Sequence, residues 1–168
     1  VENKKSLKIW KENKDQILNN LSLIDDMKFW KKFSDINNEM RHSIYIDIKS
    51  LIRIELVRVL NSMLKDKFVL VGSNWKKYCP NALEDNYTGK YTENLYRGNI
   101  CIDFGSKQSE RCIYSRSCKI IESGGLLFQS INKDSKEIFK NLIDKTCFIS
   151  IQDMKEKISF FLKNSDQI

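Results

Sequence analysis

Histidine and paired cysteines are scarce in this sequence of 168 residues. His42 is the sole histidine, and the five cysteines contain no C-x-x-C pair. An odd number of cysteines without such a pair argues against a disulfide framework, and a single histidine argues against a zinc site. We therefore expect reduced thiols in a reducing compartment. A catalytic cysteine–histidine pair built on His42 has no local support.

Long apolar runs are also missing. No stretch approaches the roughly 20 apolar residues that a membrane-spanning helix needs. The charged N-terminus lacks the apolar core of a signal peptide. We therefore expect a soluble, cytoplasmic chain without a membrane span. Its start at Val1 suggests a fragment or a processed chain.

Positive charge is in excess. Lysine and arginine number 29 against 22 acidic residues, which gives a net charge of +7. This charge is spread along the sequence, so it favours acidic or phosphorylated partners without choosing among nucleotide, nucleic acid and anionic lipid. The alternative is a lysine-rich solvated surface. The length predicts one domain with a real core.

Residues 1–43 carry apolar side chains at helical spacing, with a break at Asp25-Asp26. This spacing predicts a helical extension, or a connector that packs on a preceding domain. From residue 44 the pattern changes. A β-branched run at 44–48, an amphipathic segment at 51–64 and an apolar run at 68–71 predict a strand, a helix and a strand, which form parallel neighbours.

The rest of the sequence alternates strand and helix patterns. Strands are expected at 99–104, 126–128 and 147–151, and helices at 92–97, before Ser123, at 135–143 and at 152–163. This alternation predicts an α/β fold for residues 44–168, a Rossmann-like parallel sheet of about five strands flanked by helices.

The most informative stretch reads Y-S-R-S-C-K-I-I-E-S-G-G-L-L-F-Q from Tyr114 to Gln129. It is typical of a helix that turns sharply into a buried strand. Arg116 and Lys119 offer cationic donors to phosphate, and Glu122 offers an acceptor to a sugar diol. The glycine corner adds the backbone N–H groups of Ser123, Gly124 and Gly125. The alternative is a helix C-terminus closed by glycine, with Lys119 stabilised by the helix dipole.

Two further segments accompany this stretch: L-V-G-S-N-W from Leu70 to Trp75, and N-L-Y-R-G-N-I-C-I-D-F-G-S from Asn94 to Ser106. Together the three resemble the C-terminal half of spore-maturation-type (CgeB-like) glycosyltransferases, which have the two-Rossmann-domain GT-B architecture. The resemblance covers roughly residues 44–163. Its most specific part is the pattern R-x-x-x-I-x-E-x-G-G.

The resemblance implies a donor domain that holds a nucleoside diphosphate sugar for transfer to an unknown acceptor, which is a glycan, a protein or a lipid-linked molecule. It implies that Glu122 contacts the ribose, that Gly124 and Gly125 let the backbone approach the nucleotide, and that Arg116 lies near the diphosphate. Gly72 and Trp75 would line the base side. Many retaining enzymes carry a second glutamate eight positions before the first, where this chain has Tyr114.

Transfer requires stabilisation of the departing diphosphate, for which Arg116 and Lys119 are the catalytic candidates. No D-x-D motif occurs, so we expect no obligatory metal ion and no cofactor. Arg116 has a structural alternative, a salt bridge to Glu110 or Glu122, and Asp103 has one in a turn or cap. A GT-B enzyme also needs an N-terminal acceptor domain, which 43 helical residues cannot build.

Two other functions are compatible with these residues. A single-stranded nucleic-acid-binding module would use the positive charge together with five aromatic side chains. These are Trp75, Tyr78, Tyr87, Tyr91 and Tyr96. A degenerate α/β interaction domain would keep the fold without binding nucleotide or catalysing transfer.

Overall fold

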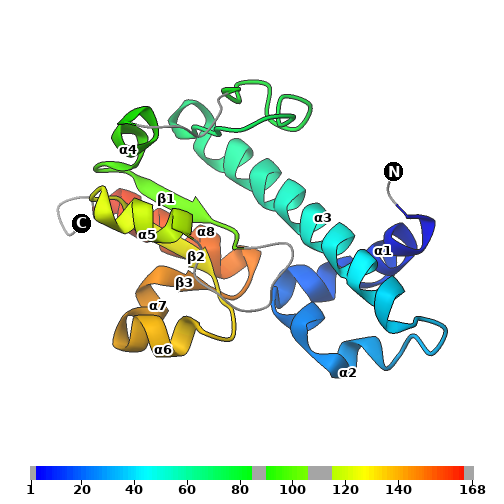
Figure 1. The fold of residues 1–168 in the computed structure, drawn as a ribbon. Helices are drawn as coiled ribbons and strands as arrows, with labels where there is room; N and C mark the ends of the chain where they lie inside the picture. The colour runs from blue at the N-terminus through cyan, green and yellow to red at the C-terminus, as the bar shows by residue number, and fades with distance from the viewer. Residues whose placement is uncertain (1–2, 85–89, 106–114, 165–168) are drawn as a thin grey trace.

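The computed structural model describes residues 3–84, 90–105 and 115–164. A group of N-terminal helices stands beside a small parallel sheet that is flanked by further helices, and the long helix α3 runs past both parts (Figure 1). The helices are α1 (Lys4–Asn19), η1 (Leu23–Asp25), α2 (Met27–Trp30), α3 (Asn38–Leu64), η2 (Lys65–Lys67), α4 (Lys90–Tyr96), α5 (Ser115–Glu122), α6 (Ser135–Phe139), η3 (Lys140–Leu142), α7 (Ile143–Thr146) and α8 (Ile151–Lys163). This arrangement confirms a mixed α/β fold.

The described sheet has three parallel strands in the order β1-β2-β3, rather than the expected five or so. They are β1 (Ile100–Asp103), β2 (Leu126–Ser130) and β3 (Cys147–Phe148). Each strand lies in a segment for which the sequence predicted one. Helix α5 connects β1 to β2, and α6, η3 and α7 connect β2 to β3. The expected continuous helix at 135–143 is thus broken, and Lys140 has a positive φ of 46°.

The strand predicted at 44–48 is wrong, because these residues belong to α3. Helix α3 begins after Asn37, whose side-chain oxygen accepts a hydrogen bond of 2.8 Å from the Met40 N–H. Apolar residues then recur every four positions along one helix face and are buried: Ile44, Ile48, Ile52, Leu56 and Leu60. This long helical stripe outweighs the local β-propensity of the branched side chains.

The strand predicted at 68–71 is also wrong. Its only described sheet-like pairing is the isolated bridge between Val71 and Leu83, and Val69 is exposed. The predicted strand–helix–strand unit is therefore absent. A long helix and a loop take its place, which accounts for the shorter sheet.

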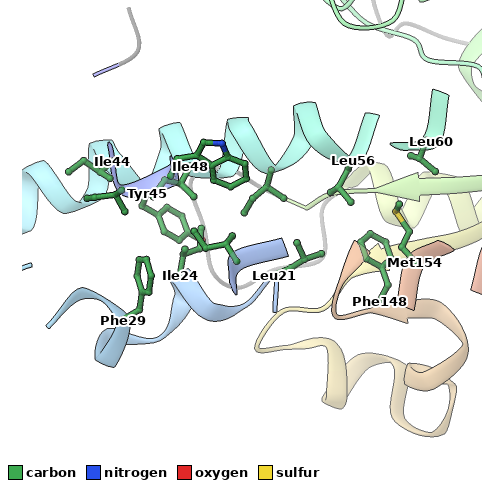
Figure 2. Close-up of a cluster of buried hydrophobic side chains, with 14 of the residues drawn as sticks. Leu21, Ile24, Phe29, Ile44, Tyr45, Ile48, Leu56, Leu60, Phe148 and Met154 are labelled. Atoms are coloured by element: carbon green, nitrogen blue, oxygen red, sulfur yellow. The ribbon is translucent and has the colours of Figure 1, made fainter. Parts of the chain in front are cut away.

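A single hydrophobic cluster joins the N-terminal helices to the sheet. Figure 2 shows Tyr45, in the first half of α3, pointing towards Ile24 of the N-terminal helices. In the second half of α3, Leu60 lies near Met154 of α8. The boundary expected after residue 43 falls inside this helix.

No helix in the described part of the chain combines the length and the apolar character that a membrane span requires.

Candidate functional site

A buried carboxylate marks the carboxyl edge of the sheet. Asp103 is the last residue of β1, and its side chain has no solvent exposure. Its Oδ1 accepts hydrogen bonds of 3.0 Å from the Gly105 N–H and from the Arg116 guanidinium. Its Oδ2 accepts a bond of 2.6 Å from the Ser117 hydroxyl. The bond from Gly105 closes an Asx turn, which was one of the two roles expected for Asp103.

Arg116 and Ser117 reach this carboxylate because they lie in the first turn of α5. A crossover helix between parallel strands begins near the carboxyl end of the strand that precedes it, so its first turn lies beside Asp103. The Arg116 side chain is 39% exposed, so solvent or a ligand can reach it. Its partner Asp103 was not among the partners expected for it. Of those, Glu110 lies outside the described residues.

Gln129 lies behind this ion pair. It is the β2 residue in register with Asp103, and it is 1% exposed. The Ser117 hydroxyl stands 2.6 Å from Asp103 and 3.3 Å from the amide oxygen of Gln129, but it has one proton to donate. The shorter distance assigns that proton to Asp103.

The amide of Gln129 is therefore only partly satisfied. Its Nε2 is buried without a hydrogen-bond partner among the described residues. Turning the amide by 180° would let Nε2 donate to the Ser117 oxygen and would leave Oε1 in the unpaired position. In either orientation at least one buried polar atom of the amide lacks a partner, and such an atom is costly.

Helix α3 fixes this edge from the other side. The Arg53 guanidinium donates a hydrogen bond to the Gly105 carbonyl. Gly105 has a φ of +67°, a region that favours glycine. Two contacts therefore hold the turn after β1: the Gly105 N–H bonds to Asp103, and the Gly105 carbonyl bonds to Arg53 of α3.

Neither Ser117 nor Gln129 was among the site residues predicted from the sequence. Gln129 interrupts the apolar run of β2 at the position where a strand approaches its carboxyl end. A polar residue at that position of an otherwise apolar strand could have indicated a site residue. Ser117 offered no such indication, because a serine in the first turn of a helix is common.

The glycine corner lies at the other end of α5. The Gly124 N–H donates to the Ile121 carbonyl at 3.0 Å, and the Gly125 N–H donates to the Ile120 carbonyl at 2.9 Å. Gly124 has a φ of +76°. These bonds form a Schellman motif, which closes a helix C-terminus. The Ser123 N–H also bonds within this turn, to the Lys119 carbonyl at 3.0 Å.

Gly125 is needed for close packing. A Cβ at this position would lie 2.7 Å from the Tyr96 carbonyl oxygen and 3.1 Å from that of Ile120. The close neighbour of the Gly125 backbone is thus the carbonyl of Tyr96 at the end of α4, and not a ligand. The glycine-closed helix end, which was the alternative expectation, accounts for the geometry of the glycine pair.

The structure therefore separates the predicted site residues along α5. From Arg116 to Glu122 the helix advances about 9 Å, six residues at about 1.5 Å each. Arg116 lies at the carboxyl edge of the sheet, and Glu122 is exposed near the amino end of β2. Lys119 lies between them and is exposed. Tyr114 lies outside the described residues.

Gly72 and Trp75 belong to neither end of α5, because both lie in the loop after α3. The Gly72 N–H donates to the Leu83 carbonyl at 2.9 Å, and the φ of Gly72 is +144°. Trp75 is half-buried and packs against the same small cluster as Phe104, the residue after β1. The contact with Phe104's cluster brings this loop nearer to the carboxyl edge than the sequence spacing suggests.

The two cysteine thiols in the sheet are partly shielded from solvent, which disfavours their thiolate form. Burial raises the pKa of Cys101 to about 11. Burial also raises the pKa of Cys147, which lies in β3 beside Gln129. Among the described residues, no three His, Cys, Asp or Glu side chains gather in a way that would hold a metal ion.

Comparison of the chain with protein-family models, with curated proteins and with solved structures found no match.

Proposed function

We propose that this chain is the donor domain of a glycosyltransferase and binds the diphosphate of a nucleoside diphosphate sugar at the carboxyl edge of its sheet. In this proposal the three parallel strands and their crossover helices are the core of a small Rossmann-like domain. The acceptor and the catalytic base would come from a second, N-terminal domain of GT-B type.

The observation that carries the proposal is the position of Arg116. It lies in the first turn of α5, next to the carboxyl end of β1, where open α/β sheets bind their ligands. Its ion pair with Asp103 fixes the guanidinium before a ligand arrives, and its 39% exposure leaves it accessible. The α5 N-terminus adds backbone N–H groups that favour a negative ligand.

Ser117 and Gln129 support the same position. A buried amide with one unpaired atom is unusual in a folded protein, and it is common at sites that bind something. The amide lies directly behind Arg116 through the shared hydroxyl of Ser117. We propose that a bound ligand, or water held with it, completes its hydrogen bonding.

The chemistry follows from fixed positive charge. Negative charge develops on the diphosphate as the glycosidic bond to the sugar breaks, and donors that are already in place stabilise it without reorganisation. Arg116 is the principal catalytic candidate. Lys119 lies one helical turn further, about 4.5 Å along α5, so its long side chain can add a second charge.

The ribose contact expected of Glu122 receives no support from its position. Glu122 lies at the amino edge of the sheet, next to a glycine pair whose N–H groups already close α5. The binding of nucleotide therefore gives a sharp test, because Arg116 and Glu122 lie at opposite ends of one helix.

The test is calorimetric titration of the chain with uridine, guanosine, thymidine and adenosine diphosphates. We expect one of them to bind. Arg116→Gln keeps a donor for Asp103 but removes the charge, and it should weaken binding about tenfold or more, as the loss of a charged hydrogen bond does. Arg97→Ala removes an exposed arginine elsewhere and should leave binding unchanged, as should Glu122→Ala.

Two outcomes would contradict the proposal. Binding that depends on Glu122 and not on Arg116 would move the site to the amino edge of the sheet. The absence of binding to all four diphosphates, in a protein with an intact thermal unfolding transition, would favour a degenerate interaction domain.

A further inference from the structure

Hydrogen bonds and buried contacts hold the loop that follows η2 in a defined conformation. Between Leu70 and Leu83 its two ends pair through the Leu83 N–H, which donates to the Leu70 carbonyl at 2.8 Å. Cys79 and Ala82 are buried against Val57 of α3. The loop is therefore anchored on α3 at its centre and closed at its ends.

This framework brings two aromatic rings together. The Trp75 carbonyl accepts hydrogen bonds of 2.9 Å from the N–H groups of Tyr78 and Cys79, which turn the chain back on itself. As a result the rings of Trp75 and Tyr78 lie 6.0 Å apart at an interplanar angle of 64°. Both residues are half-buried.

Positive charge surrounds this aromatic pair. The Lys77 ammonium lies 4.6 Å from the centroid of the Tyr78 ring, and the Arg58 guanidinium of α3 lies 5.7 Å from it. Lys76 and Lys77 are exposed. Residues 72–83 contain no carboxylate, although Arg58 also pairs with Glu55 at 2.9 Å.

We propose that this aromatic–cationic surface, formed by Arg58, Trp75, Lys76, Lys77 and Tyr78, binds single-stranded nucleic acid. In this proposal bases stack against the aromatic rings in place of the Lys77 and Arg58 groups that lie over Tyr78, and the three cations bind the neighbouring phosphates. Stacking on aromatic side chains accepts any base, so the surface binds single strands with little sequence preference. None of these residues belongs to the Asp103 cluster, although Trp75 packs against the same small cluster as Phe104, the residue after β1.

The combination of groups favours a nucleic acid over other anionic partners. An acidic peptide would use the cations alone, whereas a single strand uses the cations and the aromatic rings together. Trp75 and Tyr78 are two of the five aromatic residues that the sequence predicted for such a module. Of the others, Tyr96 packs against the Ile120 cluster instead, Tyr87 lies outside the described residues, and the structure does not describe the side chain of Tyr91.

Intrinsic fluorescence tests the contact directly. Trp10 and Trp30 are 6% and 7% exposed, so Trp75 is the most accessible of the three tryptophans. Titration with a twelve-residue oligothymidine or oligouridine at low salt should quench the fluorescence saturably. Trp75→Phe keeps a ring for packing and stacking, and it should abolish the quenching while fluorescein-labelled oligonucleotide still binds.

Anisotropy of the labelled oligonucleotide measures the contribution of each group. Tyr78→Ala should weaken binding about tenfold, whereas Tyr78→Phe, which keeps the ring, should leave it nearly unchanged. The double variant K76Q/K77Q should lower the slope of log K against log salt by about 1.4, since each phosphate contact on a single strand contributes about 0.7. K31Q/K32Q removes two exposed adjacent lysines, the C-cap of α2 and the residue after it, and should leave that slope unchanged.

Several results would overturn this inference. If K76Q/K77Q and K31Q/K32Q weakened oligonucleotide binding equally, the binding would depend on the overall positive charge and not on this surface. Equal affinity for polyglutamate or for phosphatidylserine vesicles would show a general anion surface. Loss of binding in Arg116→Gln, with Tyr78→Ala unaffected, would place the oligonucleotide at the carboxyl edge of the sheet instead.

Discussion

Arg116 and Asp103 form an ion pair of 3.0 Å between the first turn of α5 and the last residue of β1. The pair joins a partly exposed guanidinium to a carboxylate without solvent exposure. Because the carboxylate also accepts from Gly105 and Ser117, it connects the strand, the turn after it and the crossover helix. The same contact thus holds the fold and orients the proposed ligand-binding arginine.

Asp103→Ala should lower the free energy of unfolding by about 3 kcal/mol. It leaves the Gly105 N–H without an acceptor, the Ser117 hydroxyl with only the Gln129 amide oxygen at 3.3 Å, and Arg116 without its buried partner. Urea unfolding measures this change. Asp15→Ala removes an exposed carboxylate from α1 and should change the free energy by less than about 0.5 kcal/mol. Equal effects of the two variants would mean that the Asp103 cluster contributes nothing to stability.

The two glycines after α5 should respond differently to alanine. Gly124→Ala places a side chain at a φ of +76° with no atom within 4 Å, so it should cost about 1 kcal/mol. Gly125→Ala drives a Cβ to 2.7 Å from the Tyr96 carbonyl oxygen, so it should cost about 2 to 3 kcal/mol. Thermal unfolding of both variants gives the order. The reverse order would contradict the close approach of α4 to this corner.

The shared core should make the chain unfold as one unit. Phe128 of β2 and Ile17 of α1 are both fully buried in the same hydrophobic cluster. Phe128→Ala should cost about 3 to 5 kcal/mol, and Ile17→Ala about 2 to 5 kcal/mol. Both should shift a single transition that circular dichroism and tryptophan fluorescence report together. Two separate transitions would show that the N-terminal helices and the sheet are independent.

Removal of residues 1–43 provides a second test of the same core. The remainder would begin inside α3 and would lose Ile17, Ile24 and Phe29 from the cluster. We expect this fragment to lack a cooperative thermal transition. A fragment that melts cooperatively near the temperature of the full chain would restore the boundary expected from the sequence.

The cysteines should differ in reactivity. Cys118 is exposed on α5, whereas burial raises the pKa of Cys101 from 9.0 to about 11. A raised pKa favours the neutral thiol, so at pH 8 the thiolate fraction of Cys101 falls by about one hundred-fold. Iodoacetamide should therefore label Cys118 first, and labelling of Cys101 should grow only as the pH rises towards 11. Peptide mass spectrometry resolves the two sites, and equal labelling rates at pH 8 would contradict the burial of Cys101.

Local patterns were sufficient for the strands and the closing helix in the second half of the chain. The segments predicted as strands near residues 100, 126 and 147 form β1, β2 and β3, because short apolar runs bounded by polar or glycine residues have few other stable conformations. The closing helix α8 follows from its apolar face. The same reasoning failed at 44–48, where Ile44, Ile46 and Ile48 have strand propensity, but Ile44 and Ile48 belong to a buried stripe with a spacing of four along α3.

The sequence by itself determined that the second half of the chain alternates helices with strands, and it offered a glycine-closed helix end as one of two interpretations of Gly124 and Gly125. Both depend on residues close together in the chain. Only the tertiary structure decided that Arg116 and Glu122 lie at opposite edges of the sheet and that Asp103 and Gln129 lie behind Arg116. Those relationships depend on the parallel pairing of β1 with β2, which aligns the ends of distant segments through backbone hydrogen bonds that no local pattern records.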